Sequence, residues 1–406
     1  MKTLLLAGVV LAGCTTEHGA ITGTQSIKVE LVAPASVGTV DQRLPDTQRM
    51  LTVNLTALDA VGQLDPSFAD SLRVYAQFLG TLTPDLDQMP LVTIPMVNGQ
   101  AMGQPIMLPA SVLGPTTLWI DNGTGLGADY THGQVTGTSD TLWYRDPFIA
   151  DLQTPRSETD VDALSVTPLT DKQISVSTSR YGARGRLVVT SVFSQGYTVS
   201  DVECADTSGT PPCTAAGYDH VLVFTFSAAR DQFGRLLEVG RLISKFNGGL
   251  SEFNGLTEVG FPRTFISAPD RDTPPYVNRA LMPSAVLFDI AWFGPLSNPA
   301  GRINFERNEA GAIEIRNVKV CPLDDGPDGV YTKYKQWTID PSPMGDQCSS
   351  SNVINLITAG TDFTTDPHTL VGKTLPKVIG IVRPVNIGSF NVWIVYPRGK
   401  DDLQTQ

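Results

Sequence analysis

The stretch that most clearly decides the fold class is Met50-Leu51-Thr52-Val53-Asn54-Leu55-Thr56-Ala57-Leu58, in which apolar and polar residues alternate. A period of two is typical of a β-strand with one buried face. Similar segments lie on both sides of it, at residues 26–32, 72–79, 91–96, 116–120 and 141–144. Turn residues such as Asn98-Gly99 separate these segments. The pattern predicts an all-β unit over residues 26–152.

About seven short strands at this spacing resemble an immunoglobulin-like β-sandwich. No cysteine pair lies in this region, so the resemblance rests on the strand pattern alone.

Two later regions, residues 161–269 and 311–402, resemble the OB-fold modules of secreted bacterial proteins. In the first region, a predicted strand carries Val239-Gly240-Arg241-Leu242. It is followed by a predicted turn at Gly248-Gly249 and then by a second strand around residues 253–259. In the second, residues 370–384 repeat this step and residues 390–398 form the returning strand. The resemblance implies two OB-like β-barrels.

The connecting segment, residues 270–310, is rich in Pro, Asn and Asp and could contribute to a barrel. Residues 280–293 could hold a short helix, although Pro283 limits it.

Composition supports a turn-rich β protein and argues against some partners. The 406 residues include 37 glycines and 29 prolines, which suit many short strands better than long helices. The net charge is −12, and no dense Lys/Arg cluster interrupts the acidic chain. Nucleic acid and anionic headgroups, which need at least a local basic excess, are therefore unfavoured partners for the folded body.

The N-terminus resembles that of a bacterial lipoprotein. Lys2 precedes a short apolar run that ends in Leu11-Ala12-Gly13-Cys14, a sequence similar to a lipobox. The run is too short to span a bilayer, which takes roughly 20 residues, and has the size of a signal peptide.

The resemblance implies that residues 1–13 are removed and that Cys14 becomes acylated, with palmitate among its lipids. Residues 14–25 would then form a flexible tether. The residue after Cys14 is Thr15 and not the Asp that retains lipoproteins in the inner membrane of enteric bacteria, which favours the outer membrane. A secretory signal with a chance cysteine is the alternative.

Four further cysteines fit an exported protein. They are Cys204, Cys213, Cys321 and Cys348. An even number predicts two disulfides, and proximity favours Cys204–Cys213 and Cys321–Cys348 among the three possible pairings. A metal site is disfavoured because no C-x-x-C pair is present.

No residue pattern identifies an active site. The four histidines have no metal-ligand spacing, no G-x-S-x-G elbow is present, and Gly372-Lys373-Thr374 lacks the first glycine of a phosphate-binding loop. Asp324, Asp325 and Asp328 form a weak calcium candidate, with a solvated acidic turn as the favoured interpretation. Five tryptophans could stack on sugars if exposed, but their strand positions favour partial burial.

We therefore expect a lipid-anchored envelope protein without a cofactor, displaying its β-domains to a protein or polysaccharide partner. A hydrolase whose carboxylates are dispersed in sequence but converge in space is the second hypothesis. Single-stranded nucleic-acid binding through the OB-like regions is the third, and the acidic net charge argues against it.

Overall fold

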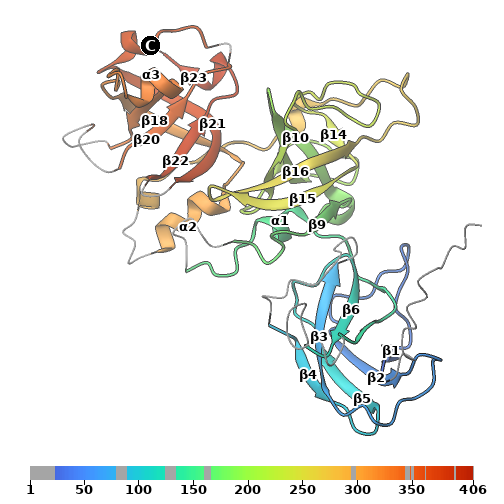
Figure 1. Ribbon diagram of the computed structural model, residues 1–406. Helices are drawn as coiled ribbons and strands as arrows, with labels where there is room; N and C mark the ends of the chain where they lie inside the picture. Colours follow the sequence, from blue (N-terminus) through green and yellow to red (C-terminus); the bar gives the residue numbers. More distant parts are fainter. Residues whose placement is uncertain are drawn as a thin grey trace, which may run out of the picture.

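The computed structural model is an all-β protein of three successive units, in which the first barrel lies between the sandwich and the second barrel (Figure 1). It describes residues 23–78, 89–123, 134–159, 166–293, 299–342, 348, 352–361, 363–387 and 390–405. The predicted signal peptide, Cys14 and most of the predicted tether lie outside these residues. No helix in the described part of the chain is long and apolar enough to cross a bilayer.

The N-terminal unit is a sandwich of two sheets. Its strands are β1 (Ser26–Ala33), β2 (Met50–Leu58), β3 (Ser71–Phe78), β4 (Val92–Pro95), β5 (Gln100–Met107), β6 (Pro115–Asp121), β7 (Thr136–Thr138) and β8 (Leu142–Trp143). One sheet has the order β1-β2-β5, and the other has the order β4-β3-β6-β7 with β8 also paired to β6. The two packed sheets confirm the predicted β-sandwich, and the pairing of the second strand with the first and fifth resembles that of immunoglobulin-like domains.

The apolar residues whose alternation predicts β2 are the residues that the structure buries. Leu51, Val53, Leu55 and Ala57 are fully buried, while the residues between them are half-buried. They pack in one core with residues of the facing sheet such as Leu118.

The middle unit is a barrel-like sheet. Its strands are β9 (Gln173–Val176), β10 (Gly185–Phe193), β11 (Gly196–Cys204), β12 (Cys213–Thr214), β13 (His220–Phe224), β14 (Leu242–Ile243), β15 (Lys245–Phe253) and β16 (Leu256–Phe265). The sheet runs β14-β10-β11-β13-β16-β15-β9, and β13 is parallel to β16. Because β14 and β15 are separated by one residue, they act as one bent strand that pairs with β10 at its start and β16 along its length.

The C-terminal unit is a closed barrel of five strands with two further two-residue strands paired to it. Its strands are β17 (Val286–Leu287), β18 (Ala312–Val320), β19 (Gln336–Asp340), β20 (Ile354–Ile357), β21 (Thr374–Ile387), β22 (Phe390–Tyr396) and β23 (Leu403–Gln404). The strand β18 pairs with both β19 and β21, which closes the barrel, and β20 is parallel to β22. The five strands of the first barrel are, in chain order, β10, β11, β13, the bent strand β14–β15, and β16; those of the second are β18 to β22. In both barrels the first strand pairs with the second and the fourth, and the third strand pairs with the fifth. This is the OB-like order that the sequence predicted.

Helices are few and short. They are α1 (Ile149–Gln153), α2 (Pro299–Arg307) and α3 (Val330–Tyr334), with 3₁₀ turns at Gly182–Arg184, Arg279–Leu281, Ile290–Phe293, Pro367–Leu370 and Lys400–Asp402. The predicted helix over residues 280–293 is wrong: the segment holds two 3₁₀ turns and the strand β17. Pro283 follows the first turn and cannot continue a helix.

The predicted turn at Gly248-Gly249 is also wrong, because both glycines lie inside β15. The hairpin turn is instead at Asn254-Gly255, where φ is +53° and +81°, the left-handed values of a tight hairpin. Gly248 marks a close approach between strands, since a Cβ there would lie 2.6 Å from the carbonyl oxygen of Gly260. The register of β15 and β16 shifts at this point.

Each unit has its own hydrophobic core, and one loop joins two of them. Val112 packs in the sandwich core, while the adjacent Leu113 is buried in the core of the first barrel. The loop that links β5 and β6 therefore packs in the cores of both the sandwich and the first barrel.

Candidate functional site

The four downstream cysteines form the two disulfides that proximity favoured. Cys204–Cys213 joins β11 to β12 with a Cα–Cα distance of 4.0 Å, and Cys321–Cys348 spans 5.4 Å. Both bonds brace the barrels and leave no thiol among these four residues.

The acidic turn at residues 324–329 is bonded within the protein. Asp328 forms an ion pair with Lys333 at 2.7 Å, and Asp325 lies 3.2 Å from His368 Nε2. Asp324 accepts a hydrogen bond from the backbone of Val330 at the start of α3. No group of three His, Cys, Asp or Glu residues in the described part of the chain could hold a metal ion.

The two histidines that the structure describes have structural partners. His220 is buried, and its Nδ1 lies 2.7 Å from Ser200 Oγ. Burial lowers the pKa of His220 to about 4, so its ring is neutral at pH 7. His368 bonds Asp366, a contact that raises the pKa of the imidazole. His18 and His132 lie outside the described residues.

The tryptophans are not an exposed sugar-binding set. Trp292 and Trp337 are buried, while Trp119, Trp143 and Trp393 are half-buried. Trp393 stacks on Phe305 with an interplanar angle of 11°. The expectation of partial burial is confirmed.

A group of phenylalanines forms the most prominent exposed apolar feature of the first barrel. Phe226 and Phe261 are 54% and 83% exposed, and their ring centroids are 4.7 Å apart. Phe224, at the end of β13, is half-buried and contacts Phe226 edge-on at 4.5 Å. We call these three residues the aromatic face. Because exposed apolar side chains gather here and do not stand singly, the aromatic face is a candidate binding surface.

The backbone of the aromatic face is strained. Phe226 has φ of +58° and Phe261 has φ of +50°. The left-handed region is a genuine outlier for a bulky residue and costs roughly 1–3 kcal/mol. Phe261 lies where the register of β15 and β16 shifts, which turns its ring outward. Strain that presents an apolar ring to solvent is a mark of function and not of stability.

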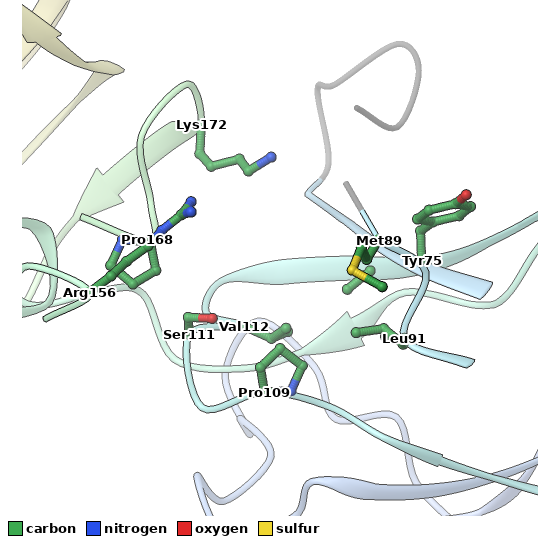
Figure 2. Close-up of a pocket in the computed structure, with 10 residues that line it drawn as sticks. Tyr75, Met89, Leu91, Pro109, Ser111, Val112, Arg156, Pro168 and Lys172 are labelled. Carbon is green, nitrogen blue, oxygen red and sulfur yellow. The ribbon is translucent and has the colours of Figure 1, made fainter. Parts of the chain in front are cut away.

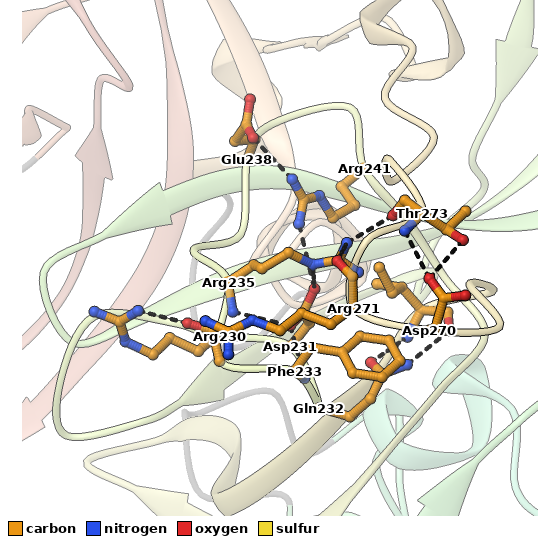
Figure 3. A network of polar contacts seen from close by, with 12 residues as sticks. Arg230, Asp231, Gln232, Phe233, Arg235, Glu238, Arg241, Asp270, Arg271 and Thr273 are labelled. Atoms are coloured by element: carbon orange, nitrogen blue, oxygen red, sulfur yellow. Dashed lines mark hydrogen bonds and ion pairs between the residues drawn. The ribbon is translucent and has the colours of Figure 1, made fainter.

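A buried ion-pair network holds the loop that follows Phe226 (Figure 3). The carboxylate of Asp231 accepts hydrogen bonds from the backbone of Phe233 and Arg235 and from Arg235 Nε at 2.9 Å. Arg241, which is 2% exposed, lies 3.6 Å from the same carboxylate and bonds Glu238. Arg235 also donates to the carbonyl oxygen of Thr273. The network links residues 231–241 to one another and to the segment around Thr273.

A polar cavity of about 310 Å³ adjoins Phe261. Its polar wall is formed by Asp146, Gln173, Ser175, Lys245 and Asn247, and the rest by the loop around Gly114 and by Gly248. The Ser175 hydroxyl is buried and has no hydrogen-bond partner. The aromatic face and this cavity together form the candidate site.

Three carboxylates converge elsewhere, between α1, α2 and the β15–β16 hairpin. Glu309 is 1% exposed, accepts a hydrogen bond from the Thr257 backbone at 2.9 Å and leaves its second oxygen without a partner. Glu252 accepts from the Thr257 hydroxyl. Burial, then the charges of Glu306 and Glu252, raises the pKa of Glu309, and burial raises that of Glu306 to about 8. Because Glu309 is sealed from solvent, it cannot reach a substrate.

No protein family, curated protein or solved structure matches this chain. The candidate site therefore rests on geometry.

Sequence reasoning missed the aromatic face. An exposed phenylalanine cannot be distinguished in the sequence from one in the core. The only local signal is Gly260-Phe261-Pro262, in which glycine and proline flank an aromatic residue within an otherwise regular strand.

Proposed function

We propose that this protein is a lipid-anchored component of the bacterial cell envelope whose first barrel binds a polysaccharide. The observation that carries the proposal is the aromatic face, with Phe226 and Phe261 held outward by a strained backbone. It acts as a non-catalytic binding module on the cell surface or on the periplasmic side of the outer membrane.

Sugar rings present an apolar C–H face and a rim of hydroxyls, so they need an aromatic platform beside polar groups. Phe226 and Phe261 supply the platform. Gln173 and Asn247, in the adjoining cavity, supply amide groups for the rim. Ligand sites with apolar walls and a few convergent polar groups commonly lie between domains, as this one does.

Single-stranded nucleic acid would also stack on exposed aromatic rings. Its phosphates would require a positive groove, whereas the chain has 41 acidic and 29 basic residues. A polysaccharide needs no such excess, so it fits the acidic protein better. A protein partner would use the same rings as buried anchors.

The test is binding of the purified chain to a panel of envelope polysaccharides by isothermal titration calorimetry, with a single-stranded oligonucleotide as comparator. Phe226→Ala and Phe261→Ala should each weaken polysaccharide binding about tenfold, the equivalent of 1.4 kcal/mol. Phe253→Ala is the matched control, since Phe253 is 62% exposed at a hairpin turn away from these rings.

Equal binding by all three variants would refute the role of the aromatic face. Tighter binding to the oligonucleotide than to any polysaccharide would replace the proposal with the nucleic-acid hypothesis. Binding to neither, with Phe261-dependent retention of an envelope protein after cross-linking, would favour a protein partner.

The anchor has its own test. Cells grown with radiolabelled palmitate should label the wild-type protein but not Cys14→Ala, and the wild-type protein should fractionate with the outer membrane. Label that persists in Cys14→Ala would refute the lipobox assignment.

A further inference from the structure

One end of the sandwich receives the chain from its N-terminal segment. The Thr24 hydroxyl donates a hydrogen bond to Asp65 Oδ2 at 2.7 Å, and the backbone N–H of Gln25 donates to the carbonyl oxygen of Leu58 at 2.7 Å. Leu58 ends β2, and Asp65 lies in the loop that leads from β2 to β3. The chain therefore enters the sandwich beside the β2–β3 loop, residues 59–70.

The barrels lie beyond the opposite end of the sandwich. The strand β5 runs antiparallel to β2, with Met107 opposite Met50, so the loop after β5 lies at the other end from the β2–β3 loop. Leu113 of that loop is buried in the core of the first barrel. Figure 2 shows this joint, where Val112 and Pro168, which precedes β9, line one cavity of about 570 Å³. The sandwich thus separates the N-terminal segment from the barrels.

Apolar side chains are exposed around the point where the chain enters. Val61 and Leu64, in the β2–β3 loop, are 76% and 42% exposed, and Val97, in the turn between β4 and β5, is 67% exposed. The loop and the turn are in contact, because Leu64 Cδ1 lies 3.0 Å from the position that a Cβ on Gly99 would take. We call Val61, Leu64 and Val97 the apolar tip. Exposed apolar side chains that gather at one place form a candidate contact surface.

Hydrogen bonds within the β2–β3 loop order the apolar tip. Asp59 Oδ1 accepts from the backbone N–H groups of Val61 and Gln63, each at 2.9 Å. Asp65 accepts from both the backbone N–H and the hydroxyl of Ser67. A loop that is already ordered loses little conformational entropy when its side chains make a contact.

The proposed lipid anchor brings a bilayer within reach of the apolar tip. Ten residues separate Thr24 from Cys14, and an extended chain spans at most about 3.6 Å per residue. Thr24 therefore lies no more than about 36 Å from the lipid-bearing residue. Attachment at so short a range makes contact between the tip and the bilayer an intramolecular event, which raises the population of a weak contact.

We propose that the apolar tip contacts the bilayer that holds the acyl chains of Cys14. The proposal rests on the lipid anchor of the proposed function and is independent of polysaccharide binding. The tip side chains enter the boundary between headgroups and acyl chains, where apolar residues leave water. Asp59 and Asp65 are not attracted to anionic headgroups, so the contact does not require anionic lipid. The sandwich then stands between the bilayer and the barrels and holds the aromatic face away from the membrane surface.

The experiment attaches the environment-sensitive dye nitrobenzoxadiazole to Val61→Cys in the lipidated chain, which is then inserted into phosphatidylcholine vesicles. The four downstream cysteines form disulfides and Cys14 carries the lipid, so the new thiol is the one that reacts. We expect the dye emission to be about twofold or more above that of the same labelled chain with Cys14→Ala, because the bilayer removes water from around the dye. The dye at Leu236→Cys, a 53% exposed position of the first barrel, is the matched control and should not respond.

Leu64→Ser/Val97→Ser should remove most of the increase at position 61, and circular dichroism shows whether each variant is folded. Adding phosphatidylglycerol to the vesicles should not enlarge the increase. Flotation of the lipidated chain with the vesicles tests the anchor separately. A chain that floats while positions 61 and 236 respond equally would overturn the proposal and leave the anchor standing, whereas a chain that does not float would refute the anchor and the proposal with it.

The remaining outcomes assign the apolar tip to another partner and also overturn the proposal. An increase that appears without vesicles and grows with protein concentration would assign the tip to a second copy of the chain. An increase in whole outer membranes but not in lipid vesicles would assign it to a protein partner. An increase that requires phosphatidylglycerol would show that the contact is electrostatic.

Discussion

Replacing Glu309 by glutamine should stabilise the protein at neutral pH. Glu309 is buried without a cation beside it, and the groups that face it are Glu306, Glu252 and the Gln153 amide. Glu258 adds to the charge around Glu252. Glutamine keeps the oxygen that accepts the Thr257 hydrogen bond and cannot ionise in the folded or the unfolded chain.

The direction of the pH effect follows from the raised pKa. Below the ordinary glutamate pKa of about 4.3, the folded and unfolded chains both hold the proton, and the carboxyl costs nothing. Above it, the unfolded chain releases the proton while the folded chain retains it, so stability falls as pH rises until the folded pKa is reached. For Glu306 that window extends to about pH 8.

The magnitude is about 1.4 kcal/mol per pH unit for each retained proton. For a carboxyl that keeps its proton in the folded chain throughout pH 5–7, this amounts to about 3 kcal/mol over the interval. For a cooperative unit of 150–250 residues, 1 kcal/mol shifts the melting temperature by about 2–4 °C. Glu309→Gln should thus melt above the wild type at pH 7, by up to about 12 °C, with a smaller difference at pH 5.

The assay is differential scanning calorimetry from pH 5 to pH 8. Glu30→Gln is the matched control, because Glu30 is an exposed glutamate of the sandwich whose side chain is 59% accessible. It should leave the melting curve and its pH dependence unchanged. If Glu309→Gln melts at or below the wild-type temperature at pH 7, the carboxyl is ionised and solvated in the folded chain, and the reasoning fails.

Three further predictions concern stability. Replacing Cys204 and Cys213 by serine should lower the free energy of unfolding by about 2.7 kcal/mol, and replacing Cys321 and Cys348 should lower it by about 3.6 kcal/mol, because the second bond closes the longer loop. Urea unfolding measures both values, and the opposite order would contradict the loop-entropy argument. Asp231→Asn should lower the free energy of unfolding by about 3–5 kcal/mol, because Arg235 loses its carboxylate partner and the buried Arg241 retains only Glu238. Hydrogen exchange over residues 227–241 should become faster, whereas the exposed Asp272→Asn should change neither quantity. Gly137→Ala should lower the melting temperature of the sandwich, since its Cβ would lie 2.1 Å from the Ile27 carbonyl oxygen, while at Gly326 the nearest atom is 3.7 Å away and alanine should be tolerated.

The sequence predicted the strands best where one face is buried. The alternation at residues 50–58 matches β2 because each inward residue meets the same core. Glycine was harder to interpret, because it serves both turns and close contacts. Gly248 lies in a strand that approaches Gly260, whereas Gly255 completes the hairpin turn. Only the paired register distinguishes these two uses.

The candidate sites could not be predicted in the same way, because they consist of residues that depart from the pattern. Phe226 and Phe261 are apolar but point outward, and neighbouring residues Val112 and Leu113 enter different cores. The periodicity of apolar residues indicates which side of a strand is buried within one unit. It does not indicate which residues lie between two units, or which ring is turned outward by a left-handed backbone. A sequence is locally consistent where it only needs to fold, and departures from that consistency concentrate where a protein binds. Binding should therefore be sought first at the exposed rings of the aromatic face.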